Sequence, residues 1–259
     1  MHSARRPVAL VTGVGRRQGL GAAIALELAR AGWDVGFTFW KPFDQAMPWD
    51  TDDEGPAAVA DSIGAAGAST AAIEADLAVV ESPGRVFDAV EADLGPVDAL
   101  IVSHCECVPS STLDTTPEGF DRHYAVNVRG TWLLIREFAR RFAGTARGAG
   151  GRIVTLTSDH VVGNLPYGAT KAAADRITLA AAHDLAHLGI TANAINPGPV
   201  DTGWMTEAGR AEVAARTALD REAVPGDVAH LVRFLCSGDG GWITGQLLYS
   251  NGGFRSTLS

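Results

Sequence analysis

A phenol and an ammonium group stand four residues apart at Tyr167 and Lys171. If this segment is helical, both side chains lie on the same face, one turn apart. A phenol titrates at a pKa of about 10, and a neighbouring lysine cation is expected to lower that value. The pair could then exchange a proton with an alcohol or a carbonyl group near neutral pH. It follows an apolar segment that leads into Ser158, so we expect it beside the carboxyl end of a strand.

A glycine-rich turn lies near the start of the chain, between an apolar segment and a helical pattern. Its glycines let the backbone turn sharply and approach a ligand, and the free N–H groups of the following helix attract a diphosphate. The spacing fails a strict G-x-G-x-x-G search, so a connection that only turns the chain is the alternative. The position directly after the first strand favours a dinucleotide site. The residues expected to contact the cofactor here are Gly13, Gly15, Arg16, Arg17, Gly19 and Leu20.

The second predicted strand ends without a carboxylate, because Lys41 follows it and the first acidic residue is Asp44. An Asp or Glu at that strand end favours NAD. Arg16, Arg17 and Lys41 could instead pair with a 2′-phosphate. We therefore expect NADP(H), with NADPH preferred over NADH. The alternative is that the three cations are ordinary solvated surface groups.

Strand and helix signals alternate along the chain. The predicted strands are 8–12, 35–40, 70–74, 97–102, 152–157, 190–195 and 246–249, and the predicted helices are 20–30, 57–65, 83–94, 117–142, 167–188 and 225–236. Apolar strands joined by helices indicate an α/β fold with a parallel sheet covered on both faces. Right-handed crossovers make it a doubly wound sheet of the Rossmann type, with about seven strands and a ligand crevice at their carboxyl ends. We expect a single domain over residues 1–259, with a solvated loop at 41–55 and a substrate lid at 201–224.

Composition limits the function classes. The net charge of -9 argues against nucleic acid and an anionic membrane as partners, and no run of about 18 apolar residues predicts a membrane span. The odd number of cysteines, 3, fits a reducing cytoplasm better than a disulfide framework. His104, Cys105 and Cys107 suggest a metal, but they lack a clear fourth ligand, so we expect none.

The whole chain resembles the short-chain dehydrogenase/reductase family, most closely the NADP-using carbonyl reductases of the 3-oxoacyl-carrier-protein reductase type. The motifs that carry the resemblance are the turn at 12–21, Asp76-Leu77, Asn127-Val128-Arg129-Gly130, Ser158, Tyr167 with Lys171, Asn196-Pro197-Gly198 with Thr202, Ile243-Thr244-Gly245-Gln246, and Asn251-Gly252-Gly253.

The resemblance implies a role for each catalytic residue. Tyr167 is the general acid in carbonyl reduction and the base in alcohol oxidation. Lys171 bonds the nicotinamide ribose and lowers the pKa of the tyrosine. Ser158 polarises the substrate oxygen, although Thr157 could take this role. Asn127 holds a water in a proton relay, unless it is a helix-kink residue that bonds its own backbone.

The resemblance also implies cofactor contacts beyond the glycine turn. Asp76 and Leu77 contact the adenine, unless Asp76 is only a helix N-cap. Ser103 lies near the cofactor ribose, and the nicotinamide end is lined by Pro197, Gly198 and Thr202.

The same resemblance implies a homo-oligomer, a tetramer rather than a dimer. In such an assembly, the helices 117–142 and 167–188 of two subunits pair across a two-fold axis. Small residues would allow these helices to pack closely, although contacts within one chain explain the small residues equally well; the residues are Ala172, Ala173, Ala180 and Ala181.

Three features depart from the family pattern. The glycine turn is two residues longer than usual. The segment Ser103-His104-Cys105-Glu106 replaces the family's N-N-A-G, so its larger side chains point away from the cofactor or narrow the nicotinamide end, and Glu106 could project towards the substrate. The loop 159–166 is shorter than usual, which predicts an open substrate pocket. Candidate substrate contacts are His160, Asn164, Trp204 and Met205.

These features predict an NADP(H)-dependent oxidoreductase that interconverts a carbonyl and a secondary alcohol by hydride transfer, with a tyrosine as acid and base. Its partner is a small carbonyl or alcohol substrate. The altered segment 103–106 leaves one alternative open, a cofactor-binding regulatory protein with little or no turnover. The intact Ser158, Tyr167 and Lys171 argue against that alternative, and the four-residue Tyr–Lys spacing argues against enoyl reduction.

Overall fold

One seven-stranded sheet forms the centre of the molecule in the computed structural model, which describes residues 5–47, 54–142, 150–203 and 205–255. All strand pairs are parallel, and the strand order is β3-β2-β1-β4-β5-β6-β7. The strands are β1 (Val8–Val11), β2 (Asp34–Phe39), β3 (Thr70–Glu74), β4 (Ala99–Val102), β5 (Gly151–Leu156), β6 (Ile190–Asn196) and β7 (Leu247–Tyr249). The order reverses between β1 and β4, which is where a doubly wound sheet opens a crevice. The predicted α/β class and Rossmann-type sheet are confirmed.

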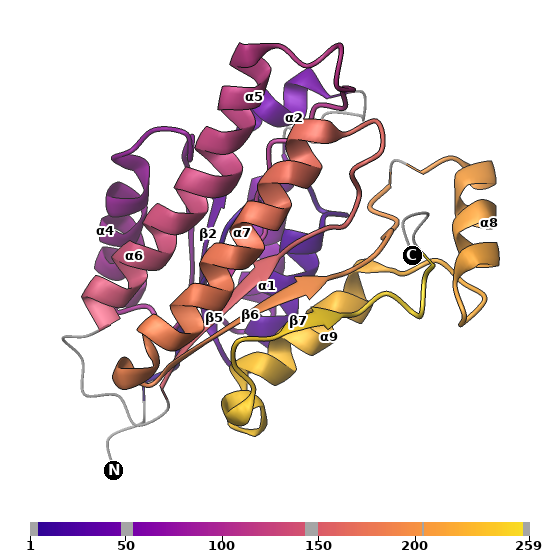
Figure 1. The fold of residues 1–259 in the computed structure, drawn as a ribbon. Coiled ribbons are helices and arrows are strands. Elements are labelled where there is room, and N and C mark those ends of the chain that lie inside the picture. Colours follow the sequence, from indigo (N-terminus) through magenta and orange to yellow (C-terminus); the bar gives the residue numbers. More distant parts are fainter. Residues whose placement is uncertain (1–4, 48–53, 143–149, 204, 256–259) are drawn as a thin grey trace.

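Helices cover both faces of the sheet (Figure 1). On one face α1 (Leu20–Arg30) packs against α3 (Gly55–Ala65) and α9 (Pro225–Cys236). On the other face α6 (Thr131–Phe142) packs against α4 (Ser82–Leu94) and α7 (Leu165–Asp184). Within the described ranges, no helix combines the length and the apolar character that crossing a membrane requires.

Successive residues of the central strands supply two separate hydrophobic cores. Ala9 and Val11 of β1 face the core under α1, α3 and α9. Val8 and Leu10 of the same strand face the core under α4, α6 and α7. This follows from the two-residue period of a strand, and it explains why these strands are apolar without interruption.

The predicted helix 117–142 is divided into three parts. It begins as α5 (Pro117–His123), passes through a π-helical segment, Tyr124–Gly130, and continues as α6. Such π-helical turns occur often at functional sites. The interruption carries Asn127 at its centre and was not predicted.

Two segments predicted as irregular contain helices. Residues 41–46 form α2 (Lys41–Ala46), which starts with Pro42 in its first turn, where the fixed φ of proline suits a helix. The segment predicted as a lid contains α8 (Glu207–Arg216), and the Thr206 hydroxyl caps this helix by accepting a hydrogen bond from the Gly209 N–H. Figure 1 shows α8 beside the sheet layers rather than within them.

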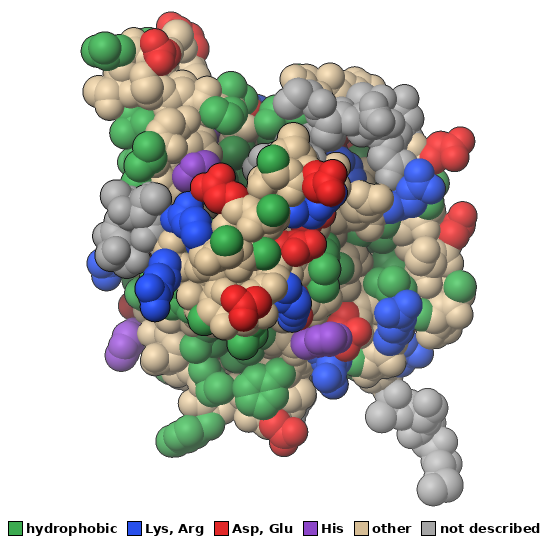
Figure 2. Space-filling model, turned by 90° about the vertical axis from the view of Figure 1, so that its right-hand side faces the viewer, with side chains coloured by type: hydrophobic (Ala, Val, Ile, Leu, Met, Phe, Trp, Pro, Cys, Tyr) green, Lys and Arg blue, Asp and Glu red, His purple; other side chains and the backbone are tan. Residues whose placement is uncertain are grey.

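Charged side chains of both signs are interspersed over the face that Figure 2 shows. Lys and Arg side chains form no continuous basic area among the described residues on that face. This distribution agrees with the acidic balance of the sequence.

Candidate active site

A cavity of about 940 Å³ lies where the strands end, and residues that follow β1 to β6 line it. Most predicted site residues meet there: Gly13, Gly15, Arg16, Gly19, Leu20, Asp76, Leu77, Ser103, Ser158, His160, Asn164, Tyr167, Pro197, Gly198, Thr202 and Met205. Lys171 and Asn127 lie buried outside the lining. Arg17 and Lys41 are exposed and do not line the cavity, and Trp204 lies outside the described residues.

The glycine turn brings the first helix close to the end of β1. Gly13 has a φ of 76°, a conformation that favours glycine. A Cβ atom on Gly21 would lie 2.6 Å from the carbonyl oxygen of Gly13, so a larger residue would push the turn away from α1. Gly19, the N-cap of α1, gives that helix end no side-chain cap. Glycine-lined, uncapped N–H groups beside a cavity fit the diphosphate of a dinucleotide.

Arg16 connects three parts of the crevice. Its Nη1 donates to the carbonyl oxygen of Thr202, 3.2 Å away, at the start of the predicted lid. Its Nε lies 3.8 Å from a carboxylate oxygen of Asp44. The short helix α2 therefore brings a carboxylate to the glycine turn, where the sequence suggested only cations.

The Ser158 hydroxyl, just after β5, lies near enough to the Tyr167 phenol to lower its pKa by hydrogen bonding. The Ser158 hydroxyl oxygen also accepts the N–H of His160, at 3.1 Å. Thr157 is buried instead, and its hydroxyl faces the carbonyl oxygen of Lys171 at 3.5 Å. Of the two neighbouring hydroxyl groups, Ser158 is the one that lies beside the phenol.

Burial raises the pKa of Tyr167 well above the usual value for a phenol. The nearby Cys105 and Cys107 thiols act in the same direction, and the hydrogen bond with Ser158 opposes them. The expected lowering of this pKa by Lys171 is therefore not observed. The reason is that removing a phenolate from water costs more than the neighbouring groups regain.

Lys171 lies beneath the tyrosine ring, with its Nζ 5.7 Å from the ring centroid. Its ammonium group donates to the carbonyl oxygen of Leu156, 2.8 Å away on β5. The side chain is buried. A backbone carbonyl thus fixes the position of this cation below the catalytic candidates.

Asn127 bonds neither its own backbone nor the helix around it. Its Oδ1 accepts the N–H of Glu106 at 2.7 Å, and its Nδ2 donates to the carbonyl oxygen of Glu106 at 2.9 Å. The same Nδ2 donates to the Thr170 hydroxyl, also at 2.9 Å. The alternative of a residue bonding its own backbone is therefore wrong. The amide ties the segment after β4 to helix α7.

His104 faces the protein interior. Its Nε2 lies 3.1 Å from the carbonyl oxygen of Val126, and its Nδ1 lies 2.8 Å from the Thr12 hydroxyl. A carbonyl can only accept, so Nε2 carries the proton, and the Thr12 hydroxyl donates to Nδ1. Burial, aided by the charge of Lys171, lowers the pKa of His104 to about 4. A neutral imidazole therefore fastens the end of β1 to the π-helical segment.

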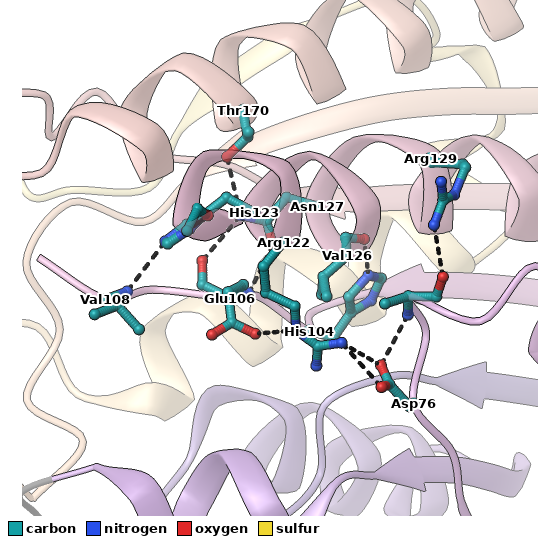
Figure 3. A network of polar contacts seen from close by, with 12 residues as sticks. Asp76, His104, Glu106, Val108, Arg122, His123, Val126, Asn127, Arg129 and Thr170 are labelled. Carbon is teal, nitrogen blue, oxygen red and sulfur yellow. Dashed lines mark hydrogen bonds and ion pairs between the residues drawn. The ribbon is translucent and has the colours of Figure 1, made fainter. Parts of the chain in front are cut away.

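Glu106 points towards Arg122 rather than towards the substrate end (Figure 3). Arg122 in turn donates to both carboxylate oxygens of Asp76, at 3.0 and 2.9 Å. Asp76 also accepts the N–H of Ala78. The alternative of Asp76 as a helix N-cap is wrong, because α4 begins at Ser82.

Three other candidate substrate contacts line the same cavity as Tyr167; they are His160, Asn164 and Met205. Asn164 is buried, its Nδ2 lies 3.5 Å from the sulfur of Cys107, and its Oδ1 has no hydrogen-bond partner. Burial raises the pKa of the Cys105 thiol to about 11 and also raises that of Cys107. Among the described residues, no group of three His, Cys, Asp or Glu side chains is placed to hold a metal ion.

Asp44 and Arg122 line the cavity and pair with predicted site residues, but the sequence analysis did not predict either of them. Asp44 lines the cavity only because α2 folds back over the glycine turn. Arg122 belongs to none of the motifs that carry the family resemblance. Its position on α5, five residues before Asn127, was the one available signal.

A family model described as Enoyl-(Acyl carrier protein) reductase matches residues 13–255. The chain is 34% identical over 98% of its length to an uncharacterized oxidoreductase, YjdA, of Bacillus subtilis (strain 168), of which 99% is covered. It is 34% identical to a short-chain type dehydrogenase/reductase of Picea abies, over 95% of this chain and 91% of that protein.

Two further similarities concern NADPH. An NADPH-dependent aldehyde reductase-like protein, chloroplastic, of Arabidopsis thaliana is 32% identical, with 95% of this chain and 93% of that one covered. The crystal structure of a blue fluorescent protein from a metagenomic library in complex with NADPH has a TM-score of 0.83 and 30% identity, covering 97% of this chain and 99% of that one.

The buried His104 predicts a loss of stability in mild acid. Its pKa of about 4 lies below the value of 6.5 for a free imidazole, so the unfolded chain binds the proton more tightly. This stability is present above about pH 6.5 and is lost as the pH falls towards 4, by about 3 kcal/mol in full. In His104→Asn, the free energy of unfolding, measured by urea denaturation, should fall less between pH 7 and pH 4.5 than in the wild type.

The matched control is His183→Asn, which removes an exposed imidazole from the end of α7. Its stability should follow the wild-type pH profile. If the free energy of unfolding of His104→Asn fell between pH 7 and pH 4.5 by as much as that of the wild type, His104 would not be the source of the acid sensitivity.

Proposed function

Since the chain belongs to the short-chain dehydrogenase/reductase family, we propose that it is an NADP(H)-dependent oxidoreductase that interconverts a small carbonyl compound and its secondary alcohol by hydride transfer, with Tyr167 as acid and base. The observation that carries the proposal is that Ser158 and Tyr167 line the same cavity as the glycine turn, with the two hydroxyl groups beside each other.

In this proposal, each residue of the site has a separate role. When bound, the nicotinamide cofactor supplies the hydride. The Ser158 hydroxyl orients and polarises the substrate oxygen, and the Tyr167 phenol, kept protonated by its raised pKa, gives that oxygen a proton. Lys171, held by the carbonyl oxygen of Leu156, places a cation below the phenol and stabilises the phenolate that remains. Asn127, assigned to a water relay by resemblance, holds the backbone beside this group.

NADPH is the cofactor we propose over NADH. Arg16 lies in the cavity, and its guanidinium suits a 2′-phosphate. The names of the Arabidopsis relative and the metagenomic structure both include NADPH. Asp44 competes for Arg16, so the phosphate must replace a carboxylate that already pairs with it.

Carbonyl reduction is favoured over enoyl reduction, which the matching family model names. The Tyr167–Lys171 spacing of four residues supports the former. Within carbonyl reduction, the resemblance to 3-oxoacyl-carrier-protein reductases makes acyl thioesters one substrate group, and simple ketones and aldehydes are the other. The segment 201–224 serves as the lid in this proposal, because Met205 and Thr206 line the cavity.

The chain is further proposed to form a homo-oligomer, a tetramer rather than a dimer, through α5, α6 and α7. Trp132 and Tyr124 expose 47% and 38% of their surface on this side. Ala172 and Ala180 are exposed on α7, but Ala181 is buried in the chain's own core, so a contact within the chain explains it. In light scattering, the wild type should have the mass of a tetramer, and Trp132→Glu should dissociate it. A monomeric wild type would overturn this proposal.

The assay that tests the function is NADPH oxidation with ketones, aldehydes, 3-oxoacyl thioesters and an enoyl thioester. Turnover of the carbonyl compounds supports the proposal. Binding of NADPH with no turnover on the whole panel would instead support a regulatory protein, and turnover of the enoyl thioester alone would support the other reductase class.

Tyr167→Phe removes the proton donor and leaves the ring in place. We expect kcat to fall by about 10³-fold, with the Kd for NADPH, measured by calorimetry, within about twofold of the wild type because the phenol is not needed for cofactor binding. The matched control is Tyr249→Phe, which changes an exposed phenol on β7. Near-normal turnover of Tyr167→Phe would reject its role.

Substitutions of Arg16 and Asp44 should change the preference for NADPH over NADH in opposite directions. Arg16→Ala should lower kcat/KM for NADPH at least about tenfold, with little effect on NADH, because the phosphate loses a charged partner. Asp44→Asn should raise the NADPH to NADH ratio by releasing Arg16. Arg30→Ala, at the opposite end of α1, is the control. A wild type that prefers NADH would contradict the cofactor proposal.

A further inference from the structure

Asn164 carries a buried hydrogen-bond acceptor that the described part of the chain leaves unsatisfied. The side chain exposes 3% of its surface and lines the cavity, and its Oδ1 has no hydrogen-bond partner. An acceptor that has lost water without gaining a donor costs free energy, so such groups are rare in folded proteins. Beside a cavity, this one indicates a ligand that supplies the missing donor.

The helix that begins after Asn164 does not use its side chain. Asn164 is the N-cap of α7, where an asparagine usually accepts the N–H of the second or third helical residue. Here the side chain makes no such bond. Pro166, the second residue, has no N–H, and the Leu165 N–H donates to the carbonyl oxygen of Ser110 at 3.0 Å. The amide is therefore not needed to cap the helix.

A weak contact holds the Asn164 amide. Its Nδ2 lies 3.5 Å from the sulfur of Cys107. Burial raises the pKa of that thiol, so the sulfur is neutral and a poor acceptor. The last side-chain torsion of asparagine has no narrow preference. The amide can therefore turn towards a ligand in the cavity without breaking a strong hydrogen bond.

The backbone around Asn164 is fixed, in contrast to its amide. Its N–H donates to the carbonyl oxygen of Val161 at 3.2 Å, and its carbonyl oxygen accepts the Gly168 N–H at 3.0 Å. Gly168 allows this loop to close onto α7, because a Cβ there would lie 2.8 Å from the carbonyl oxygen of His160. Asn164 precedes Tyr167 by three residues, a spacing that places two side chains on the same side of a helix.

A neutral donor fits this part of the cavity better than a cation. The thiols of Cys105 and Cys107 are kept neutral by burial, and the charge of Lys171 acts on both of them. Glu106 is engaged in an ion pair with an arginine. An ammonium group would lose its water and meet the Lys171 cation without gaining a carboxylate. A hydroxyl group needs only the one acceptor that Asn164 offers.

We propose that Asn164 is a specificity-determining residue that selects carbonyl substrates with a hydroxyl group on the neighbouring carbon. The O–H of the substrate donates to Oδ1 of Asn164, while Ser158 and Tyr167 hold the carbonyl oxygen. The inference rests on the proposed function and goes further by naming the substrate class, α-hydroxy ketones and aldehydes. NADPH gives a hydride to the carbonyl carbon and becomes NADP⁺, Tyr167 gives a proton to the oxygen, and the product is a vicinal diol.

The first test compares two ketones of equal size. Hydroxyacetone carries the hydroxyl group, and butanone has a methyl group in its place. The kcat/KM of each is measured with the wild type and with Asn164→Leu, which keeps the size of the side chain and removes the acceptor. The ratio of hydroxyacetone to butanone should fall at least about tenfold in the variant. Comparing the two proteins cancels the different intrinsic reactivity of the ketones.

A second pair of ketones tests the direction of the hydrogen bond. Methoxyacetone and 2-pentanone are also equal in size, and the methoxy oxygen accepts but cannot donate. Asn164→Leu should therefore change the ratio of this pair by less than about twofold. A loss as large as that for hydroxyacetone would mean that the amide donates, and it would overturn the role of Oδ1.

The matched control is Val162→Ala, which changes an apolar side chain of the same loop that also lines the cavity. Its ratio of hydroxyacetone to butanone should equal that of the wild type. Asn164→Asp keeps an acceptor, so its ratio should stay above that of Asn164→Leu. If Asn164→Leu fails to fold, Asn164→Ala makes the same comparison.

Urea denaturation separates selectivity from a structural role. Asn193 is also buried, but both ends of its amide are bonded: Nδ2 donates to the carbonyl oxygen of Ile243 at 2.8 Å, and Oδ1 accepts the Gln246 N–H at 3.1 Å. Asn193→Leu should lower the urea midpoint, whereas Asn164→Leu should keep or raise it, because it removes an unsatisfied acceptor. An equal loss in both variants would make the Asn164 amide structural and would overturn the inference.

The outcomes also separate this inference from the proposed function. A wild type that reduces the ketones, with a ratio of hydroxyacetone to butanone that Asn164→Leu leaves unchanged, rejects the inference and keeps the proposed function. A wild type that binds NADPH but reduces no carbonyl compound rejects the proposed function, and the inference with it.

Discussion

Three hydrogen bonds from one buried amide hold the active-site region together. Asn127 pairs with both backbone groups of Glu106, as a neighbouring strand would, and reaches Thr170 on the helix that carries Tyr167 and Lys171. The π-helical segment gives this side chain its position, because an uninterrupted helix would turn residue 127 to another direction. The segment after β4, the π-helical segment and the helix α7 are therefore joined at one residue. An unpaired amide at this depth would be costly, so the arrangement is both stable and specific.

The fold could be predicted from the sequence because its signals are local and repeated. Each apolar strand is followed by a helix, and that alternation allows few topologies. The central strands carry the clearest pattern, since both of their faces are buried. The short helix α2 and the π-helical segment were missed because neither has a periodic pattern long enough to recognise. Tertiary contacts decide both of them: α2 lies against the glycine turn, and the π-helical segment carries Asn127.

Most residues of the candidate site lie together at the strand ends, as the sequence predicts, but their contacts differ from the expectation. Ser158 and Tyr167 lie together where the motif placed them, yet the pKa of Tyr167 moves opposite to the expectation, because the depth of burial cannot be read from a four-residue spacing. Glu106 turns towards Arg122 for a similar reason: its partner comes from a helix 16 residues away. Charged partners that are distant along the chain leave no pattern in the sequence. Motifs specify which groups are present, and long-range contacts decide their protonation and direction.

The alternation of β1 between two cores has a consequence for how this chain can change. Ala9 and Val11 pack with one set of helices, and Val8 and Leu10 pack with the other. Substitutions that face each other within one core interact through shared contacts, whereas substitutions on opposite faces have free energies that add. The sheet thus divides the interior into two cores, which are connected only through the backbone of the strands. One face can accumulate compensating replacements while the other, and the crevice at the strand ends, keeps its geometry.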